Sequence, residues 1–382
     1  MEFIAAIILT FVVSGVLTAF LLPKIVSIAV KKDLYDLPDE RHIHIGKVPR
    51  LGGLAFLPAM IFAVFLVFSL KSPFSFNADD KEFFLPMRQL LIAGLGSVVM
   101  YIVGVADDIA GVRYRHKFVA QAIAAGLMCL SGVWIDSFHG FLGIYQIPMW
   151  LGMPFTILIV VLVINSINLI DGIDGLASGL CIIGISAFAF LFICNGYDRF
   201  TMVAVAALGC LVPFYGYNVF GTPEKRNKIF LGDTGSLFMG YLLSFFAIKT
   251  TTIEPLAVEM NQAYYLVYAY SILLLPVLDV LRVFYNRIRR RRNPFLPDKT
   301  HIHHKFLALG LSMRQARWLI FAISAMFFAV NMTLCVMGFS INWIILIDIV
   351  LWCAYHMILT RLIMRRYSRP DAVIINTDLI NW

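Results

Sequence analysis

Long apolar runs separated by short polar segments make up most of the chain. Eleven of these runs approach or exceed the ~20 residues that cross the hydrocarbon layer of a membrane. The eighth run is the weakest, because its apolar part is short and it contains Ser244, Lys249 and three threonines. The pattern predicts an all-α polytopic membrane protein with about eleven transmembrane helices. The predicted spans are 3–22, 51–70, 88–106, 117–133, 149–167, 176–194, 200–219, 236–252, 264–285, 316–337 and 342–363.

Composition supports this fold class. The chain has 382 residues, of which 60% are hydrophobic and 14% charged, whereas soluble proteins carry roughly a quarter charged residues. The six cysteines form no CxxC pair, so neither a disulfide framework nor a thiolate metal site is indicated. Glu2 stands where a cleaved signal would be basic, so the first run is expected to be a spanning helix. We expect one transmembrane domain, 1–365, and a short cytoplasmic tail, 366–382.

Basic residues are distributed unevenly between the two sides of the predicted bundle. Of the 31 Lys and Arg residues, all but five (Lys71, Lys81, Arg88, Arg199 and Lys249) lie in or beside alternate segments, which gives 31 − 5 = 26 on one side. The positive-inside rule then predicts an external N-terminus and a cytoplasmic C-terminus. This placement in short loops explains the net charge of +8 better than nucleic-acid binding does.

The predicted cytoplasmic side also holds every marked cluster of polar residues. Such one-sidedness is typical of an enzyme that works at one membrane leaflet. A transporter of lipid-linked or anionic solutes is a distant alternative, because transporters usually place their polar groups near the midplane.

The densest polar cluster follows the fifth run. Asn165, Asn168, Asp171 and Asp174 recur at every third position. Three residues fall about 60° short of a full helical turn, so these side chains can face one ligand only if the helix ends among them. The glycines of the segment 172–175 supply that break. We expect a helix that stops at the membrane surface and turns two amides and two carboxylates toward a ligand; a helix cap with a polar turn is the simpler alternative.

Two further clusters suit phosphate chemistry. Asp107 and Asp108 are adjacent, and neighbouring carboxylates repel each other unless a cation lies near, so they predict a Mg²⁺ or phosphate site, or else a solvated helix end. The segment Phe230-Leu-Gly-Asp233-Thr-Gly-Ser236 resembles a phosphate-binding turn that enters a helix. Its glycines permit close backbone approach, and Asp233 either completes an oxygen-ligand Mg²⁺ site or merely caps the eighth span.

A histidine cluster closes the list of polar segments. His301, His303 and His304 are expected to donate hydrogen bonds to phosphate oxygens, with a zinc site and a solvated loop as alternatives. The preceding arginines, 287–292, are interpreted as a topology signal and as lipid-headgroup contacts. Carboxylates, a hard cation, glycine turns and imidazoles on one leaflet together indicate phosphoryl transfer that involves a lipid.

Five of these motifs in this order resemble the polyprenyl-phosphate N-acetylhexosamine-1-phosphate transferases. The resemblance covers about residues 1–365. The form His301-Ile-His-His304 resembles the WecA/TagO branch, which implies transfer of N-acetylglucosamine 1-phosphate from its UDP donor to undecaprenyl phosphate, with release of UMP. The matching pieces are Arg50-Leu-Gly-Gly53, Asp107-Asp108, Asn165 to Leu176, Phe230 to Ser236, and Pro297 to His304.

The resemblance implies a role in the first membrane step of O-antigen, teichoic acid or similar glycan synthesis. Transfer from another UDP-N-acetylhexosamine, or from UDP-muramoyl pentapeptide by a peptidoglycan translocase, is the alternative. A CDP-alcohol phosphotransferase is argued against, because Leu176 to Gly196 contains neither a carboxylate nor an arginine. The implied setting is the bacterial inner membrane, with the active site on the cytoplasmic face. Membrane lipid is an expected partner, and nucleic acid is not. The sequence leaves open whether the protein forms a homodimer and whether the reaction has one step or two.

Site residues follow from the motifs and the resemblance. The implied cofactor is Mg²⁺, with Mn²⁺ as the alternative, at Asp233 with Asp107 and Asp108. The N-terminal segment reads Arg41-His42-Ile-His44 where the family usually has Arg-Lys-x-His. Residues expected in catalysis are Asp107, Asp108, Asp171, Asp174, Asp233, His301, His303 and His304. Residues expected to bind substrates are Arg50, His44, Lys117, Asn165, Asn168, Asn218, Phe230, Gly232 and Ser236.

Overall fold

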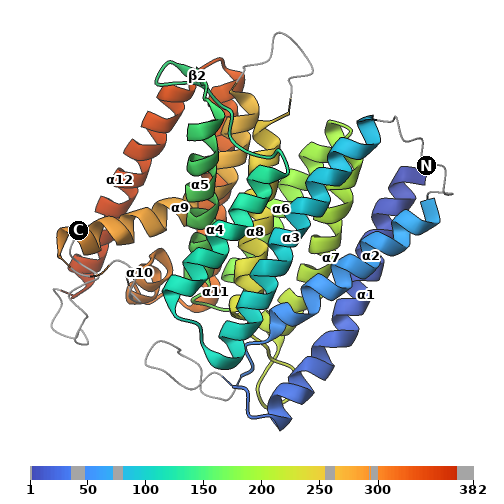
Figure 1. Cartoon of the computed structure of the whole chain (residues 1–382). Coiled ribbons are helices and arrows are strands. Elements are labelled where there is room, and N and C mark those ends of the chain that lie inside the picture. The colour runs from blue at the N-terminus through green and yellow to red at the C-terminus, as the bar shows by residue number, and fades with distance from the viewer. Residues whose placement is uncertain are drawn as a thin grey trace. The chain divides into compact units, whose positions relative to one another are not determined.

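A computed structural model describes residues 2–35, 48–71, 81–253, 263–291, 293 and 300–367. Within them a helix forms at each of the eleven predicted spans (Figure 1). These are α1 (Glu2–Lys31), α2 (Phe56–Lys71), α3 (Lys81–Ala110), α4 (Tyr114–Leu130), α5 (Met149–Ile170), α6 (Leu176–Cys194), α7 (Asp198–Phe220), α8 (Gly232–Thr251), α9 (Tyr264–Arg289), α11 (Met313–Val336) and α12 (Ile341–Tyr367). Two shorter helices are η1 (Gly52–Ala55) and α10 (Ile302–Ala308).

Nine helices in the described part of the chain are long and apolar enough to cross a membrane. The prediction of an all-α polytopic membrane protein is therefore confirmed. The two predicted spans that fall short are α4, which has 17 residues, and α8.

Helix α8 departs from the others because it is enclosed by protein. Every residue from Thr234 to Thr251 is buried, and α8 packs against α3, α5, α6 and η1. Two of its hydroxyl groups bond within the helix: that of Ser244 donates to the Gly240 carbonyl at 2.7 Å, and that of Thr251 donates to the Ile248 carbonyl at 2.8 Å. A helix without a lipid-facing side does not need strong hydropathy, which explains its weak apolar character.

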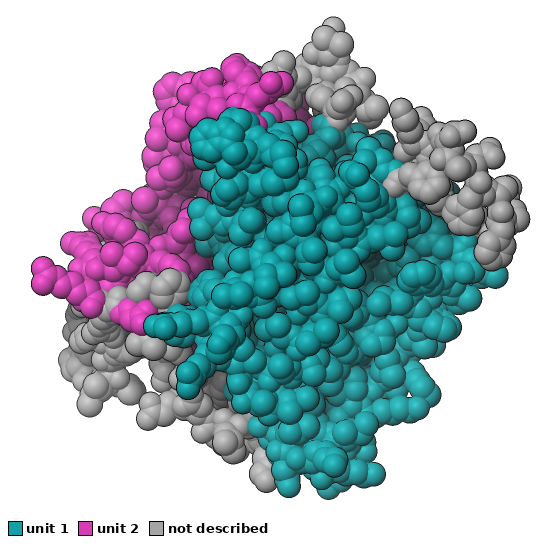
Figure 2. All heavy atoms as spheres, viewed as in Figure 1, with its two compact units in different colours: residues 1–136, 148–256 teal, residues 137–147, 257–382 magenta. Residues whose placement is uncertain are grey.

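The chain forms two compact units, coloured separately in Figure 2. Unit 1 comprises residues 1–136 and 148–256, and holds η1 and α1 to α8. Unit 2 comprises residues 137–147 and 257–382, and holds α9 to α12 with a β-hairpin. The single domain over 1–365 stays a prediction.

The β-hairpin was not predicted from the sequence. Strands β1 (Ser137–Phe141) and β2 (Ile144–Gln146) pair antiparallel. Both turn residues, Leu142 and Gly143, have positive φ, as a type I′ turn requires. From α12, Asn342 accepts a hydrogen bond from the Leu142 amide at 2.8 Å and holds the turn. A strand of three residues next to long apolar helices leaves too short a pattern to recognise.

Candidate functional site

Two polar segments of unit 1 pair as a short backbone ladder immediately before α8. The Phe230 amide donates to the Pro49 carbonyl at 2.8 Å, and the Gly52 amide donates to the Phe230 carbonyl at 3.0 Å. Gly232 follows with φ +70, and a Cβ on it would lie 1.8 Å from the Arg50 carbonyl oxygen. Only glycine fits there, so the motifs at 50–53 and 230–236 form one structure.

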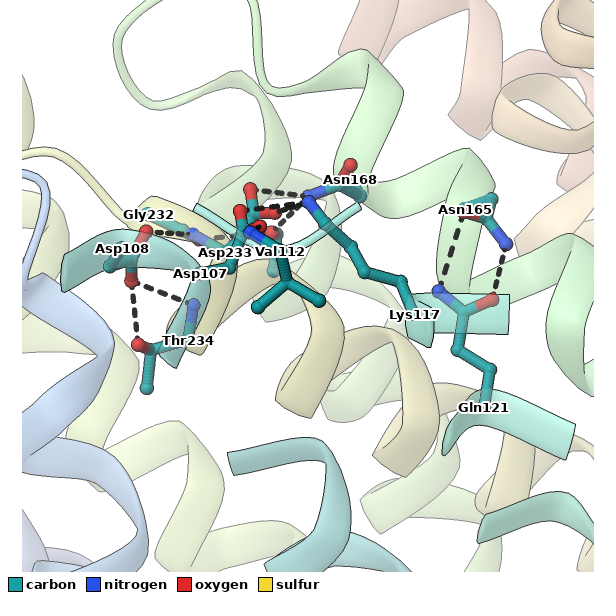
Figure 3. A network of polar contacts seen from close by, with 11 residues as sticks. Asp107, Asp108, Val112, Lys117, Gln121, Asn165, Asn168, Gly232, Asp233 and Thr234 are labelled. Carbon is teal, nitrogen blue, oxygen red and sulfur yellow. Dashed lines mark hydrogen bonds and ion pairs between the residues drawn. The ribbon is translucent and has the colours of Figure 1, made fainter. Parts of the chain in front are cut away.

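Asp108, at the end of α3, caps the N-terminus of α8. Its Oδ1 accepts from the Asp233 amide at 2.7 Å. Its Oδ2 accepts from the Thr234 amide at 2.9 Å and from the Thr234 hydroxyl at 2.6 Å (Figure 3). The residue before α8, Leu231, provides no side-chain cap of its own. A carboxylate here satisfies free amides and the positive end of the helix dipole. This arrangement favours a positioning role for Asp108 over metal binding.

Asp107 and Asp233 meet at the ammonium group of Lys117. The Lys117 Nζ lies 2.8 Å from Asp107 Oδ2 and contacts Asp233 Oδ2 even more closely. Asn168, from α5, donates to Asp233 Oδ1 at 2.9 Å and to the Ser236 hydroxyl at 2.8 Å. Figure 3 shows these side chains pointing toward one another from α3, α4, α5 and α8. Four helices thus bring two carboxylates, one cation and one amide to a single point.

This acidic group can hold a divalent cation with two protein ligands. Among the described residues, no three His, Cys, Asp or Glu side chains are arranged to hold a metal ion. Lys117 lies between Asp107 and Asp233, where a cation would balance both charges. Mg²⁺ is commonly held by one or two carboxylates together with substrate phosphate oxygens. The oxygen donors of Asp107 and Asp233 fit that requirement, whereas those of Asp108 are taken up by α8.

The turn after α5 forms where the glycines had predicted it. Helix α5 ends at Ile170, and Gly175, with φ +74, precedes α6. The four side chains at every third position nevertheless share no common partner among the described residues. Asn165 donates to Gln121 Oε1 at 2.7 Å, while Asn168 reaches Asp233. Asn165 is therefore tied to the interior of unit 1 through Gln121, which sequence reasoning did not single out.

Asn218 and Lys228 hold the turn between α5 and α6. The Asn218 side chain accepts from the Gly175 amide at 2.6 Å and donates to the Ile229 carbonyl at 2.9 Å. Lys228, which is buried, forms an ion pair with Asp174 at 2.5 Å. Lys228 was missed, although its place between Asn218 and Phe230 in a candidate segment was an available signal.

Asp171, which directly follows α5, makes no hydrogen bond or ion pair with the part of the chain that the structure describes. Burial is the main cause that raises its pKa to about 8, and the negative charges of Asp174, Asp233 and Asp108 raise it further. Its carboxyl group is therefore mostly protonated at neutral pH, when no added cation lies beside it.

The predicted histidines lie in unit 2, around the start of α10. The His301 and His303 rings are parallel, with centroids 5.9 Å apart. His303 is 1% exposed, and neither ring nitrogen has a partner among the described residues. Burial, followed by the neighbouring imidazoles of His304 and His301, holds the pKa of His303 well below its usual range. Burial also lowers the pKa of Lys305 to about 7. The predicted site residue His44 lies outside the described residues.

Comparisons with known proteins agree with the resemblance seen in the motifs. Residues 90–251 match glycosyl transferase family 4. A Bacillus subtilis (strain 168) protein named "Probable undecaprenyl-phosphate N-acetylglucosaminyl 1-phosphate transferase" is 29% identical over 375 residues, 97% of this chain and 93% of its own length. Proteins of Salmonella typhi and Escherichia coli (strain K12), both named "Undecaprenyl-phosphate alpha-N-acetylglucosaminyl 1-phosphate transferase", are 27% and 26% identical over 84% of this chain and 82% of their own. The predicted resemblance is confirmed.

Proposed function

We propose that this chain, which matches glycosyl transferase family 4 over residues 90–251, transfers N-acetylglucosamine 1-phosphate from UDP-N-acetylglucosamine to undecaprenyl phosphate. A lipid phosphate oxygen forms a bond to the phosphorus next to the sugar. The bond from that phosphorus to the UMP oxygen breaks, and UMP leaves with the electron pair. The relatives named for this transfer support the choice of acceptor and sugar.

The observation that carries the proposal is the acidic group of Asp107, Lys117 and Asp233. It brings carboxylates from two helices, α3 and α8, to one point. Two carboxylates beside one ammonium group can hold a magnesium diphosphate, because the cation neutralises the acids and the lysine attracts phosphate oxygens.

Each residue then has a task. Asp233 and Asp107 would hold Mg²⁺, which offsets the negative charge that spreads over the transferred phosphoryl group. Asn168 keeps Asp233 in place through its amide. Lys117 neutralises the carboxylates until a cation binds. The turn held by Asn218 and Lys228 would border the nucleotide, and His301, His303 and His304 would contact the diphosphate.

Sidedness is part of the proposal. The excess of basic residues in alternate segments supports a cytoplasmic active site in the bacterial inner membrane. The hydrogen bonds that tie Asp108 to α8, Asn168 to Asp233 and Asn218 to Gly175 keep three of those segments together at one end of unit 1. A nucleotide-sugar donor would be available on that side.

The test is UMP release by the purified full-length chain in detergent. We expect release from UDP-N-acetylglucosamine only when undecaprenyl phosphate and Mg²⁺ are both present, with the sugar phosphate recovered on the lipid. UDP-N-acetylgalactosamine and UDP-muramoyl pentapeptide, assayed alongside, should react at least about 10-fold more slowly. Faster reaction with either donor would replace the proposed sugar.

A second measurement separates transfer from transport. Proteoliposomes loaded with buffer are incubated with UDP-N-acetylglucosamine labelled in the sugar, and the label is followed both on lipid and inside the vesicles. We expect label on lipid only. Accumulation of intact nucleotide sugar inside, without UMP release, would identify a transporter instead.

A further inference from the structure

Asp279, a buried carboxylate in unit 2 that belongs to no motif, forms a hydrogen bond with His301, the first residue of the histidine cluster. Asp279 lies in the second half of α9 and is 1% exposed. Its Oδ2 is 2.8 Å from Nδ1 of His301. The Ile302 amide also donates to this carboxylate, at 3.1 and 3.2 Å to its two oxygens. Asp279 therefore binds both the ring of His301 and the backbone that follows it.

Arg282 pairs with Asp279 and binds the backbone on the N-terminal side of His301. Its Nη2 lies 2.8 Å from Asp279 Oδ1 and donates to the Thr300 carbonyl at 2.6 Å. The residues before and after His301 are thus both bound to one ion pair on α9. This pair is almost entirely buried, so removing either member would leave an uncompensated charge.

The hydrogen bond to Asp279 decides which ring nitrogen of His301 carries a proton. A carboxylate only accepts, so the Nδ1 of His301 must be the donor. Its Nε2, on the opposite side of the ring, has no partner among the described residues. Carboxylates orient imidazoles in the same way at metal sites, where the far nitrogen of the ring binds the ion.

His303 provides an independent sign that a ligand belongs here. Both of its ring nitrogens are buried without a partner in the described part of the chain, and an unsatisfied buried polar group costs about 1–3 kcal/mol. The parallel ring of His301 lies beside it. A phosphate oxygen could accept from a ring N–H of this cluster and remove that cost.

From these contacts we infer that Asp279 is a positioning residue, which holds the His301 ring through its Nδ1–H so that Nε2 faces a phosphate oxygen of the nucleotide sugar. A phosphate oxygen only accepts, so Nε2 must also carry a proton when it donates to that oxygen, and the ring is then an imidazolium. The inference rests on the proposed function for the identity of the ligand. The pairing of Asp279 with His301 itself does not depend on it.

The first test reads the tautomer without any reaction. Full-length protein is labelled with [¹⁵N]histidine, and the His301 ring signals are assigned by their loss in His301→Gln. We expect a protonated Nδ1 in the wild type, and a loss of that preference in Asp279→Asn. A wild-type His301 that carries its proton on Nε2 alone would overturn the inference, whether or not the protein transfers sugar phosphate.

The second test is a double-mutant cycle on transfer. Asp279→Asn should lower kcat at least about 10-fold and change the KM for the nucleotide sugar less than about 3-fold. In a His301→Gln background the same substitution should cost less than about 2-fold, because its effect passes through the imidazole. An equal loss in both backgrounds would mean a purely structural role and would refute the inference.

The matched control is Asp348→Asn. Asp348 is another buried carboxylate of unit 2, 2% exposed, and accepts hydrogen bonds from Asn331 at 3.0 Å and Tyr270 at 3.2 Å. It touches no histidine of the cluster in the contacts that the structure describes. Its variant should keep kcat within about 2-fold and leave the His301 signals unchanged.

If the wild type shows no transfer but has the expected proton on His301 Nδ1, the proposed function fails while the pairing of Asp279 with His301 stands.

Discussion

Helices α8 and α10 each begin at a motif segment, and each is capped by an aspartate from another helix. In unit 1 Asp108 of α3 caps α8 from 125 residues away. In unit 2 Asp279 of α9 caps α10 from 23 residues away. Neither helix has a capping side chain at its own N-terminal boundary. In both cases a buried or half-buried carboxylate replaces the usual local cap.

The two caps differ in what else the carboxylate holds. Asp108 gives its oxygens to the amides of Asp233 and Thr234 and to one hydroxyl. Asp279 divides its oxygens among one amide, Arg282 and His301. The first cap therefore places the backbone of an acidic residue, whereas the second also orients an imidazole. Under the proposed function, the first cap would serve a helix start that binds a cation, and the second would serve one that donates hydrogen bonds to phosphate.

The largest expected loss of transfer comes from replacing Asp233, whose backbone amide is bound by the first cap, Asp108. Asp233→Asn should lower transfer by about 10³-fold or more, because it removes a negative ligand and weakens the hold on Lys117. The apparent Tm should stay close to that of the wild type, since Asn still accepts from Asn168. Steady-state UMP release and thermal unfolding in detergent check this. Turnover within about 10-fold of the wild type would remove Asp233 from the cation site.

Replacement of the first cap should have the next largest effect. Asp108→Asn turns an NH₂ group toward the amides or hydroxyl of α8, so we expect kcat to fall about 100-fold and the apparent Tm to drop as well. Thr234→Val removes only one of the three hydrogen bonds and should cost less than about 10-fold. If Asp108→Asn abolished transfer as fully as Asp233→Asn with no loss of Tm, Asp108 would be a ligand and not a cap.

The comparison also shows where sequence reasoning stops. Apolar runs placed each of the eleven long helices found in the described residues, because membrane insertion depends on local hydropathy. The use of Asp108 as a cap was out of reach, since a partner 126 residues away leaves no spacing to recognise. Asp279 fell inside the run 264–285 and was passed over. An ionisable residue in a predicted span was nonetheless a usable signal, and it applies equally to Asp348.

Asp171 contrasts with both caps, because no hydrogen-bond donor or cation among the described residues stabilises its charge. Its pKa of about 8 exceeds the ordinary value of ~3.9, so the folded state binds the extra proton. This contribution to stability is complete below about pH 4 and is lost as the pH rises through about 8. The apparent Tm of the wild type should therefore fall between pH 6 and pH 9 by at least about 2 °C more than that of Asp171→Asn. Asp136→Asn, at an exposed carboxylate, should follow the wild type; a parallel decline of all three would contradict the assignment.

The smallest effect should come from the arginine run that follows the second cap. Arg290 lies just past the end of α9, and we interpret its charge as a topology signal and a headgroup contact. Arg290→Ala should leave UMP release within about 2-fold of the wild type. Arg282→Ala, eight residues earlier, is the contrasting variant, because it strips Asp279 of its buried counter-ion and should lower kcat and the apparent Tm together. Similar losses in both variants would mean that the whole run contributes to the reaction, and the second cap would then extend beyond Asp279 and Arg282.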